Sequence, residues 1–299
     1  MNFSTPDKLP KRYPLNRKLL NTLEFGEISS SYIIGNTLAF FQDGRLGLYD
    51  LQRDSIVFQT QTIATDSFPI HLVDYDIPIY YNNSLKDIYI GCVDFRNPEE
   101  RNYLMDVGFH YRLNWETNNW EILPVKYPES FGEGDLGMSG FSNCCYKGDS
   151  ILYSFSNENE LTIYDKRKGI LNKTSAKSKH SEKTIPLDSN DIDNAEKNLQ
   201  AKQTNFYYRS LIFDKWKNHY YRIYAKEMDL RDKDGFFNTY KEKEYGVVVL
   251  DKHLKKVGEI SFPDKGMLSF GVSKEGLFYI IQDTTNKHHI TYATIDIKL

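Results

Sequence analysis

The sequence predicts an all-β protein of the β-propeller class. One observation is composition, because 299 residues include 22 Tyr and 18 Phe but only seven Ala. Aromatic residues favour the pleated surface of a sheet, whereas helices are rich in Ala. A second is a strand–turn–strand pattern that recurs along the chain, and a third is a strand that is apolar on both of its faces.

The recurring unit is a run of apolar strands joined by short polar turns. Its clearest copies are Thr37–Thr60, Ser150–Ser175, Tyr245–Phe262 with the preceding pair of strands, Gly276–Asp296, and a more divergent copy within Asp87–Tyr127. The turns carry Asp-Gly, Asn, Lys and Gly, which close two antiparallel strands into a hairpin. These copies predict sheets of consecutive antiparallel strands.

Aspartates stand where several of these strands end. Asp50, Asp165 and Asp251 each follow an apolar or aromatic residue and precede a polar turn. An aspartate at this position can accept hydrogen bonds from the backbone amides of the turn that follows. We therefore expect all three to hold turns rather than to carry chemistry.

The segment Tyr245–Leu250 reads YGVVVL and is apolar at consecutive positions. Successive side chains of a strand point to opposite faces, so both faces of this strand need cover. In an antiparallel protein, sheets stacked on both sides supply that cover, as the blades of a propeller do.

We count about five units, fewer than the six or seven blades expected of such a ring. The sequence therefore predicts one propeller domain over residues 21–299, incomplete at its N-terminus, after an extension over residues 1–20. A short helical insertion is expected near residues 189–203, in SNDIDNAEKNLQAKQ, with Ser189 or Asp191 as its N-cap.

Charge and hydropathy exclude several classes of protein. The net charge is −3, so no overall field attracts nucleic acid, and no nucleic-acid partner is expected. No apolar run approaches the 20 or so residues of a membrane helix. The first twenty residues lack the apolar core of a signal peptide. The three cysteines, Cys92, Cys144 and Cys145, cannot all pair within the chain, and we expect buried thiols.

Three segments carry a resemblance to a known family. They read LTIYDKRKGILNKTSAKSKH, FYYRSLIFDKWKNHYYRIYA and YGVVVLDKHLKKVGEISFP. Together they resemble an uncharacterised family of Bacteroidota proteins, domain-of-unknown-function family 4221. The resemblance is good from about Asp149 to Leu299 and loose before it. It implies a six- or seven-bladed propeller, and it supplies no reaction, substrate or catalytic residue.

The resemblance also implies a place in the cell. Members of that family are typically lipid-anchored at the cell envelope through a lipoprotein signal. Since this chain shows no such signal or lipid-attachment cysteine near its start, its location is open. A truncated start would agree with the low number of blades, and a cytoplasmic copy is the alternative.

Motifs for chemistry are absent or weak. There is no phosphate-binding loop, dinucleotide fingerprint or serine-hydrolase elbow, so no cofactor, metal or catalytic residue is predicted. Acidic residues near the predicted loops leave one enzymatic alternative, a hydrolase or lyase that acts on a polysaccharide through two carboxylates. Its candidate residues are Asp74, Asp76, Glu133 and Asp135.

The best candidate for a binding site is a pair of basic, aromatic segments, SAKSKH and KWKNHYYR. Cations beside aromatic rings can hold an anionic or sugar-like ligand. The predicted ligand-binding residues are Lys177, Lys179, His219, Tyr221 and Arg222. The sequence thus favours a non-enzymatic binding propeller for a glycan, peptide or protein partner that it does not identify.

Overall fold

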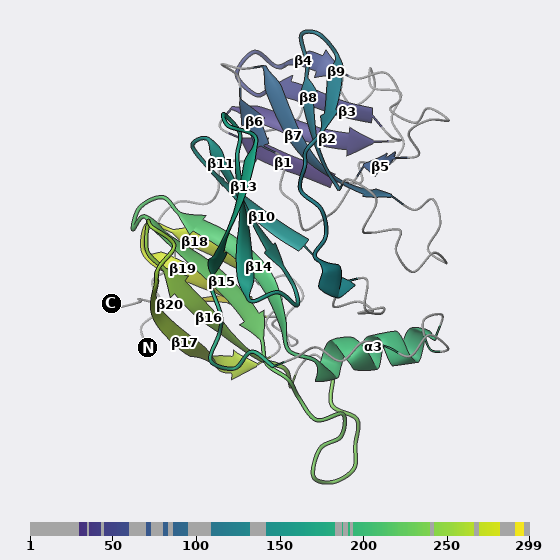
Figure 1. Ribbon diagram of the computed structural model, residues 1–299, viewed down its shortest axis with the longest axis vertical. Coiled ribbons are helices and arrows are strands. Elements are labelled where there is room, and N and C mark those ends of the chain that lie inside the picture. The colour runs from purple at the N-terminus through teal and green to yellow at the C-terminus, as the bar shows by residue number, and fades with distance from the viewer. Residues whose placement is uncertain are drawn as a thin grey trace.

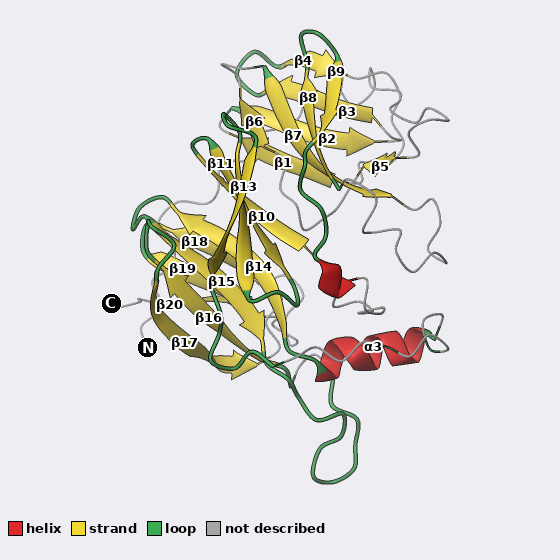
Figure 2. Ribbon diagram, in the orientation of Figure 1, coloured by secondary structure: helices red, strands yellow, loops and turns green. Residues whose placement is uncertain are grey.

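The protein consists almost entirely of antiparallel β-sheet. Its computed structural model describes residues 30–34, 36–42, 45–59, 70–72, 80–82, 86–94, 109–131, 142–182, 187, 191, 194–239, 242–265, 269–281 and 291–295. Strands predominate there, with one α-helix and a short 3₁₀ helix, Glu129–Phe131 (Figure 2). The predicted fold class, an all-β propeller, is confirmed.

Five sheets follow one another along the chain, and each is built from consecutive strands. The first contains β1 (Ser30–Ile34), β2 (Thr37–Gln42), β3 (Arg45–Asp50) and β4 (Ser55–Gln59). The second contains β5 (Ile70–Leu72), β6 (Tyr80–Asn82), β7 (Asp87–Asp94), β8 (His110–Asn114) and β9 (Asn119–Ile122). The third contains β10 (Ser142–Lys147), β11 (Ser150–Phe155), β12 (Glu160–Asp165) and β13 (Ile170–Ser175).

The fourth sheet contains β14 (Tyr207–Asp214), β15 (His219–Ala225), β16 (Glu244–Leu250) and β17 (Lys256–Lys265). The fifth contains β18 (Ser269–Ser273), β19 (Gly276–Ile281) and β20 (Thr291–Ile295). All of these strands pair antiparallel with their neighbours. In Figure 1 the first sheet (purple) and the fifth (yellow) lie at opposite ends of the molecule, so the described sheets form an open series.

The first strand of a sheet lies against the first strand of the next, where β10 contacts β14 and β14 contacts β18. Two of these inner strands, β10 and β18, were not part of the repeat seen in the sequence. β10 reads SNCCYK, without apolar alternation, and β18 reads SFGVS, in which only Phe270 and Val272 alternate. As predicted for two of the three cysteines, Cys144 and Cys145 are free thiols and are buried.

The core of the protein lies between the sheets. Val247 and Val249 pack with Leu277 and Tyr279 of the fifth sheet. Val248 points the other way and packs with Leu152 of the third sheet. Because the valines are 0% exposed, both faces of β16 are covered, as YGVVVL predicted. Each further pair of neighbouring sheets shares a similar apolar cluster.

The predicted aspartate turns are confirmed. Oδ1 of Asp165 accepts hydrogen bonds from the amides of Arg167 and Lys168, at 3.0 and 3.1 Å. Asp50 accepts from two turn amides in the same way, and these bonds lower the pKa of its carboxyl. Asp251 repeats the arrangement. Asp214, which the sequence reading did not single out, is a fourth example.

The helical insertion is present but begins later than predicted. Helix α3 spans Ala195–Thr204, and its N-cap is Asn194, whose side chain accepts from the amides of Glu196 and Lys197. Ser189 lies outside the described residues, and Asp191 lies three residues before the cap. The start was misplaced because Ser, Asp and Asn cap helices about equally well, so several positions in this segment compete.

Candidate functional site

The antiparallel order of strands gives each sheet two kinds of connection at opposite ends. Turns between its first and second and its third and fourth strands share one end. Connections between its second and third strands, and to the next sheet, share the other end, with helix α3 (Figure 1). We call these the turn face and the loop face. This topology separates the predicted binding residues.

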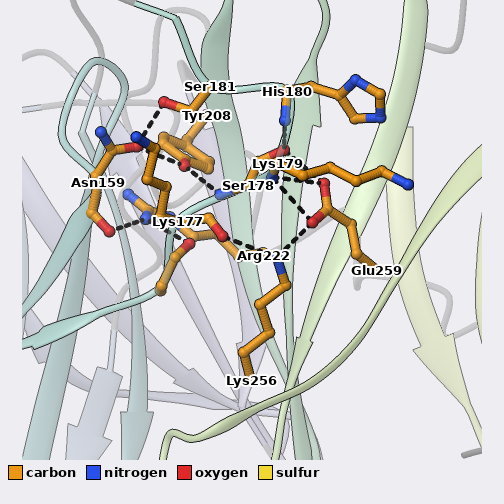
Figure 3. A network of polar contacts seen from close by, with 11 residues as sticks. Asn159, Lys177, Ser178, Lys179, His180, Ser181, Tyr208, Arg222, Lys256 and Glu259 are labelled. Atoms are coloured by element: carbon orange, nitrogen blue, oxygen red, sulfur yellow. Dashed lines mark hydrogen bonds and ion pairs between the residues drawn. The ribbon is translucent and has the colours of Figure 1, made fainter.

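Lys177 and Lys179 lie on the loop face, in the segment that follows β13. Ala176 and Ser178 are 0% exposed while both lysines are exposed, so the segment alternates inward and outward. Ser178 donates to Glu259 of β17 (2.6 Å), and the amide of Lys179 donates to the same carboxylate (3.0 Å) (Figure 3). These bonds fix the direction of the two lysine side chains.

Glu259 is the anion that anchors this segment. Its burial opposes ionisation, but hydrogen bonds from Lys256, Ser178 and the amide of Lys179 together hold the pKa of its carboxyl below the usual value. Lys256 also donates to the carbonyl of Lys177, at 3.0 Å. The segment is therefore bound to β17 by an ionised carboxylate whose charge is paired with that of Lys256.

Arg222 lies in the middle of β15 and is 0% exposed. Its Nε donates to Ser154, and its two terminal nitrogens donate to four backbone carbonyls. Figure 3 shows Arg222 with Asn159, one of these partners. The carbonyls belong to Asn159, Ala176, Phe155 and Glu158. The guanidinium also lies 3.4 Å from the ring centroid of Tyr208. Burial lowers its pKa to about 10.

These contacts revise the reading of Arg222 and Tyr221. The five N–H groups of an arginine are all used here, and Arg222 joins the third sheet to the fourth. Tyr221 is 1% exposed, and its hydroxyl donates to Asp214 at 3.1 Å. Neither side chain reaches the surface, so both support the fold around the candidate sites instead of touching a ligand.

His219 lies on the turn face, at the start of β15, whereas the two lysines belong to a connection of the loop face. It closes the turn Asp214–His219, whose tip holds Trp216, 47% exposed. The amides of Trp216 and Lys217 both donate to the buried carboxylate of Asp214. This turn is rigid, because its only carboxylate is held from three sides by protein donors.

Basic residues of neighbouring turns converge on this turn. Lys147 donates to Asn218 at 2.8 Å and lies over the rings of Phe213 and Tyr220. Burial lowers the pKa of Lys147, and the charge of Lys252 lowers it further. The ammonium of Lys217 lies beside the β18–β19 turn, 3.4 Å from the position that a Cβ on Gly276 would take. Turns of three sheets thus meet here.

The turn face of the last three sheets is basic. We name the described turns 147–149, 165–169, 214–219, 251–255 and 274–276 the basic turn face. It carries nine cations, Lys147, Lys166, Arg167, Lys168, Lys215, Lys217, Lys252, Lys255 and Lys274. Its five carboxylates are Asp149, Asp165, Asp214, Asp251 and Glu275.

All five carboxylates already have protein partners. Three accept turn amides, Asp149 pairs with Arg167 at 2.7 Å, and Glu275 accepts from Ser273 at 2.8 Å. The loop face differs, since the described residues of 156–159, 176–182, 191–206 and 226–244 carry eight Lys and Arg against ten Asp and Glu. Lys177 and Lys179 thus stand among anions, whereas Lys215 and Lys252 stand among cations.

The enzymatic alternative is not tested by this geometry. Asp74, Asp76, Glu133 and Asp135, the carboxylates of the enzymatic alternative, lie outside the described residues. In the part of the chain that the structure describes, no three His, Cys, Asp or Glu side chains group as metal ligands. No helix among the described residues is long and apolar enough to cross a membrane.

Comparison with known families identifies the chain. The sequence pattern of the domain of unknown function DUF4221 matches residues 71–261, which is more than half of the protein. The chain belongs to the DUF4221 family. The match contains nearly all of the second sheet, the third sheet and most of the fourth sheet. It includes the segment with Lys177 and Lys179 and the turn Asp214–His219. No curated protein matches the sequence.

A solved structure agrees with this assignment. A DUF4221 member from Bacteroides vulgatus superposes with a TM-score of 0.65 at 18% identity, over 87% of this chain and 76% of that one. A putative exported protein from Bacteroides fragilis gives 0.45 at 10% identity, over 86% and 67%. The Cps50 (Swd1) β-propeller domain from Myceliophteria thermophila gives 0.43 at 7% identity, over 86% and 62%. At these identities the likeness concerns the fold alone.

Proposed function

We propose that this DUF4221 protein is a non-enzymatic binding propeller that recognises an anionic partner through its basic turn face. The observation that carries the proposal is the combination of nine cations with five carboxylates that all have protein partners. An anion that approaches this face meets cations from several sheets, and each described carboxylate of the face already has a protein partner. A surface of one sign concentrates oppositely charged partners and speeds their association.

Rigidity supports the same proposal. Asp214 holds the tip of its turn through two amides and Tyr221, and Lys147 ties the neighbouring turn to Asn218. A preorganised surface loses little conformational entropy when a ligand binds, so more of the interaction energy appears as affinity. Lys177 and Lys179 are also well anchored, but the mixed charge around them makes the loop face the weaker candidate.

The proposal is tested with two double variants that remove the same charge from opposite faces. In K215Q/K252Q two cations of the basic turn face are lost, and in K177Q/K179Q two cations of the loop face are lost. Binding to immobilised dextran sulfate, a simple polyanion, is measured at low salt. Because each surface cation contributes a fraction of a kcal/mol, K215Q/K252Q should bind about fivefold more weakly.

The control variant K177Q/K179Q should bind within about twofold of the parent protein, since its cations lie on the other face. Equal or greater loss in K177Q/K179Q would move the site to the loop face, where two of the five residues predicted from the sequence, Lys177 and Lys179, lie. A parent protein that does not bind dextran sulfate at all would refute the anionic partner.

Location in the cell is a separate, finer proposal. We propose association with the cell envelope, on the family resemblance given by the sequence. Fractionation of cells into soluble and membrane fractions, followed by detection with an antibody against this protein, is the test. Recovery only in the soluble cytoplasmic fraction would count against it.

A further inference from the structure

The basic turn face also contains its one strongly exposed aromatic side chain among the described residues, Trp216. It is 47% exposed, although tryptophan carries the largest apolar surface of any residue. The ammonium of Lys215 lies over the Trp216 ring, 4.7 Å from its centroid. An exposed indole and a cation in contact with it therefore share the tip of one turn.

Hydrogen bonds of the turn hold Lys215 and Trp216 at the surface. The amide of Trp216 is hydrogen-bonded to Asp214 at 2.8 Å, and Asp214 is itself 0% exposed. Asn218, with a left-handed φ of 56°, ends the tip and is bonded to Lys147. Neither an apolar neighbour nor a second aromatic ring covers the indole among the described contacts of the turn, because Phe213 and Tyr220 pair with each other beneath Lys147.

We propose that Trp216 and Lys215 bind an acidic saccharide, a sugar ring that carries a carboxylate or sulfate group. This inference rests on the proposed function and names the ligand class of the same site. The ring of a sugar offers a flat apolar C–H face to an indole, and its acidic substituent offers an anion to the adjacent ammonium. Both complements occur within one sugar residue, and both are present within two consecutive residues of the turn.

The composition of the face favours a sugar over the other polyanions. Proteins that bind single-stranded nucleic acid present several aromatic side chains on which successive bases stack. Here a single exposed aromatic stands among cations, and eight of the nine cations are lysines. Lysine is a compact point charge without the planar fork by which arginine reads phosphate, and only Arg167 could supply that fork.

The test measures binding of the full chain to four polymers and compares three variants. The polymers are polygalacturonate (an acidic sugar), dextran (a neutral sugar), polyglutamate (an acidic peptide) and oligo-dT. The parent protein should bind polygalacturonate most tightly. W216A should weaken this binding about fivefold or more, because the stacking surface is lost. W216F should keep part of it.

A second readout separates binding from folding. Polygalacturonate should change the tryptophan fluorescence of the parent protein, and the change should be absent in W216F, which retains Trp115 and Trp120. The matched control is F236A, which removes a 72% exposed aromatic residue from the loop face and should leave binding unchanged. Circular dichroism confirms that each variant keeps its β-sheet content.

The outcomes distinguish this inference from the proposed function. If K215Q/K252Q loses polyanion binding while W216A binds polygalacturonate like the parent, the acidic-sugar inference is overturned and the anionic site remains. Equal or tighter binding of polyglutamate or oligo-dT overturns it in the same way. If the lysine variant changes nothing, the proposed function itself fails.

Discussion

At the scale of single residues, Arg222 shows how a cation can be committed to the fold. Every guanidinium N–H has an acceptor within the third sheet and its connections, and the ring of Tyr208 covers the group. A buried charge is tolerated only when it is fully hydrogen-bonded, and removal of one partner leaves the others unsatisfied. Arg222 therefore acts as a fastener between two sheets.

Replacement of Arg222 by methionine should destabilise the protein by about 3 kcal/mol, because four carbonyls and a hydroxyl lose their donor. Urea unfolding at neutral pH measures this loss. R167M is the matched control, since the Arg167 side chain is 78% exposed and its removal should change the stability by about 0.5 kcal/mol or less. A loss in R222M no larger than in R167M would contradict the role assigned to Arg222.

The sequence shows which residue types are present in the candidate site but not which of their side chains are buried. Lys, His, Tyr and Arg within two short segments look alike as a basic, aromatic pattern. Their positions differ because successive side chains of a strand point to opposite faces. In addition, two segments of similar composition can belong to connections on different faces of the protein. His219 and Lys177 were grouped by composition, and the strand order separates them. Exposure of Trp216 on a turn held by Asp214 could not be read without that order.

At the scale of secondary structure, three hairpins share a glycine covered by an aromatic ring. Gly47 lies opposite Phe40, Gly246 opposite Tyr224, and Gly271 opposite Phe278. In each pair the ring occupies the place that a Cβ on the glycine would take. A glycine in a strand often marks such a close approach, and the ring restores the packing that the glycine lacks.

The substitution G246A should therefore destabilise the protein by about 2 kcal/mol or more. A Cβ at this position would lie 2.4 Å from the Tyr224 hydroxyl and 2.7 Å from the backbone oxygen of Ile260, so a ring and a strand must both move. Thermal unfolding is the measurement. The control G148A has open space and should show only the cost, about 1 kcal/mol, of its φ of 55°.

If G246A were as stable as G148A, the close fit of Tyr224 over Gly246 would not matter for stability.

The hairpins themselves were predictable, since apolar alternation and turn residues marked the outer strands of each sheet. The inner strands β10 and β18 were missed because β10 has no apolar alternation and β18 is short, with only two apolar residues, Phe270 and Val272. Their position is set by contacts with other sheets, which leave no local signal.

At the scale of the whole molecule, the second, third and fourth sheets are each stabilised by a sheet on both sides. Val247 and Val248 are neighbours in one strand, yet they belong to different interfaces. Stability is therefore shared along the series of sheets, and a defect on one face of a strand should loosen one interface more than the other. The doubly apolar strand is the feature from which the propeller class was predicted.

We expect V247A and V248A each to cost about 2 kcal/mol, since both side chains are fully buried. Hydrogen exchange should distinguish them, with faster exchange in β19 for V247A and in β11 for V248A. V257A, at a 45% exposed position of the same sheet, is the control and should leave both patterns unchanged. Identical exchange patterns in V247A and V248A would argue against separate interfaces.

The aspartates that end the strands have an effect beyond the turns they hold. Asn114 makes the same kind of bond to the amide of Thr117 without a charge, so the backbone accepts either residue. Replacement of Asp by Asn at a strand end would thus raise the net charge of the turn face by one unit and leave the path of the backbone unchanged. The attraction of this surface for anions can in this way be tuned step by step through residues that never meet the ligand.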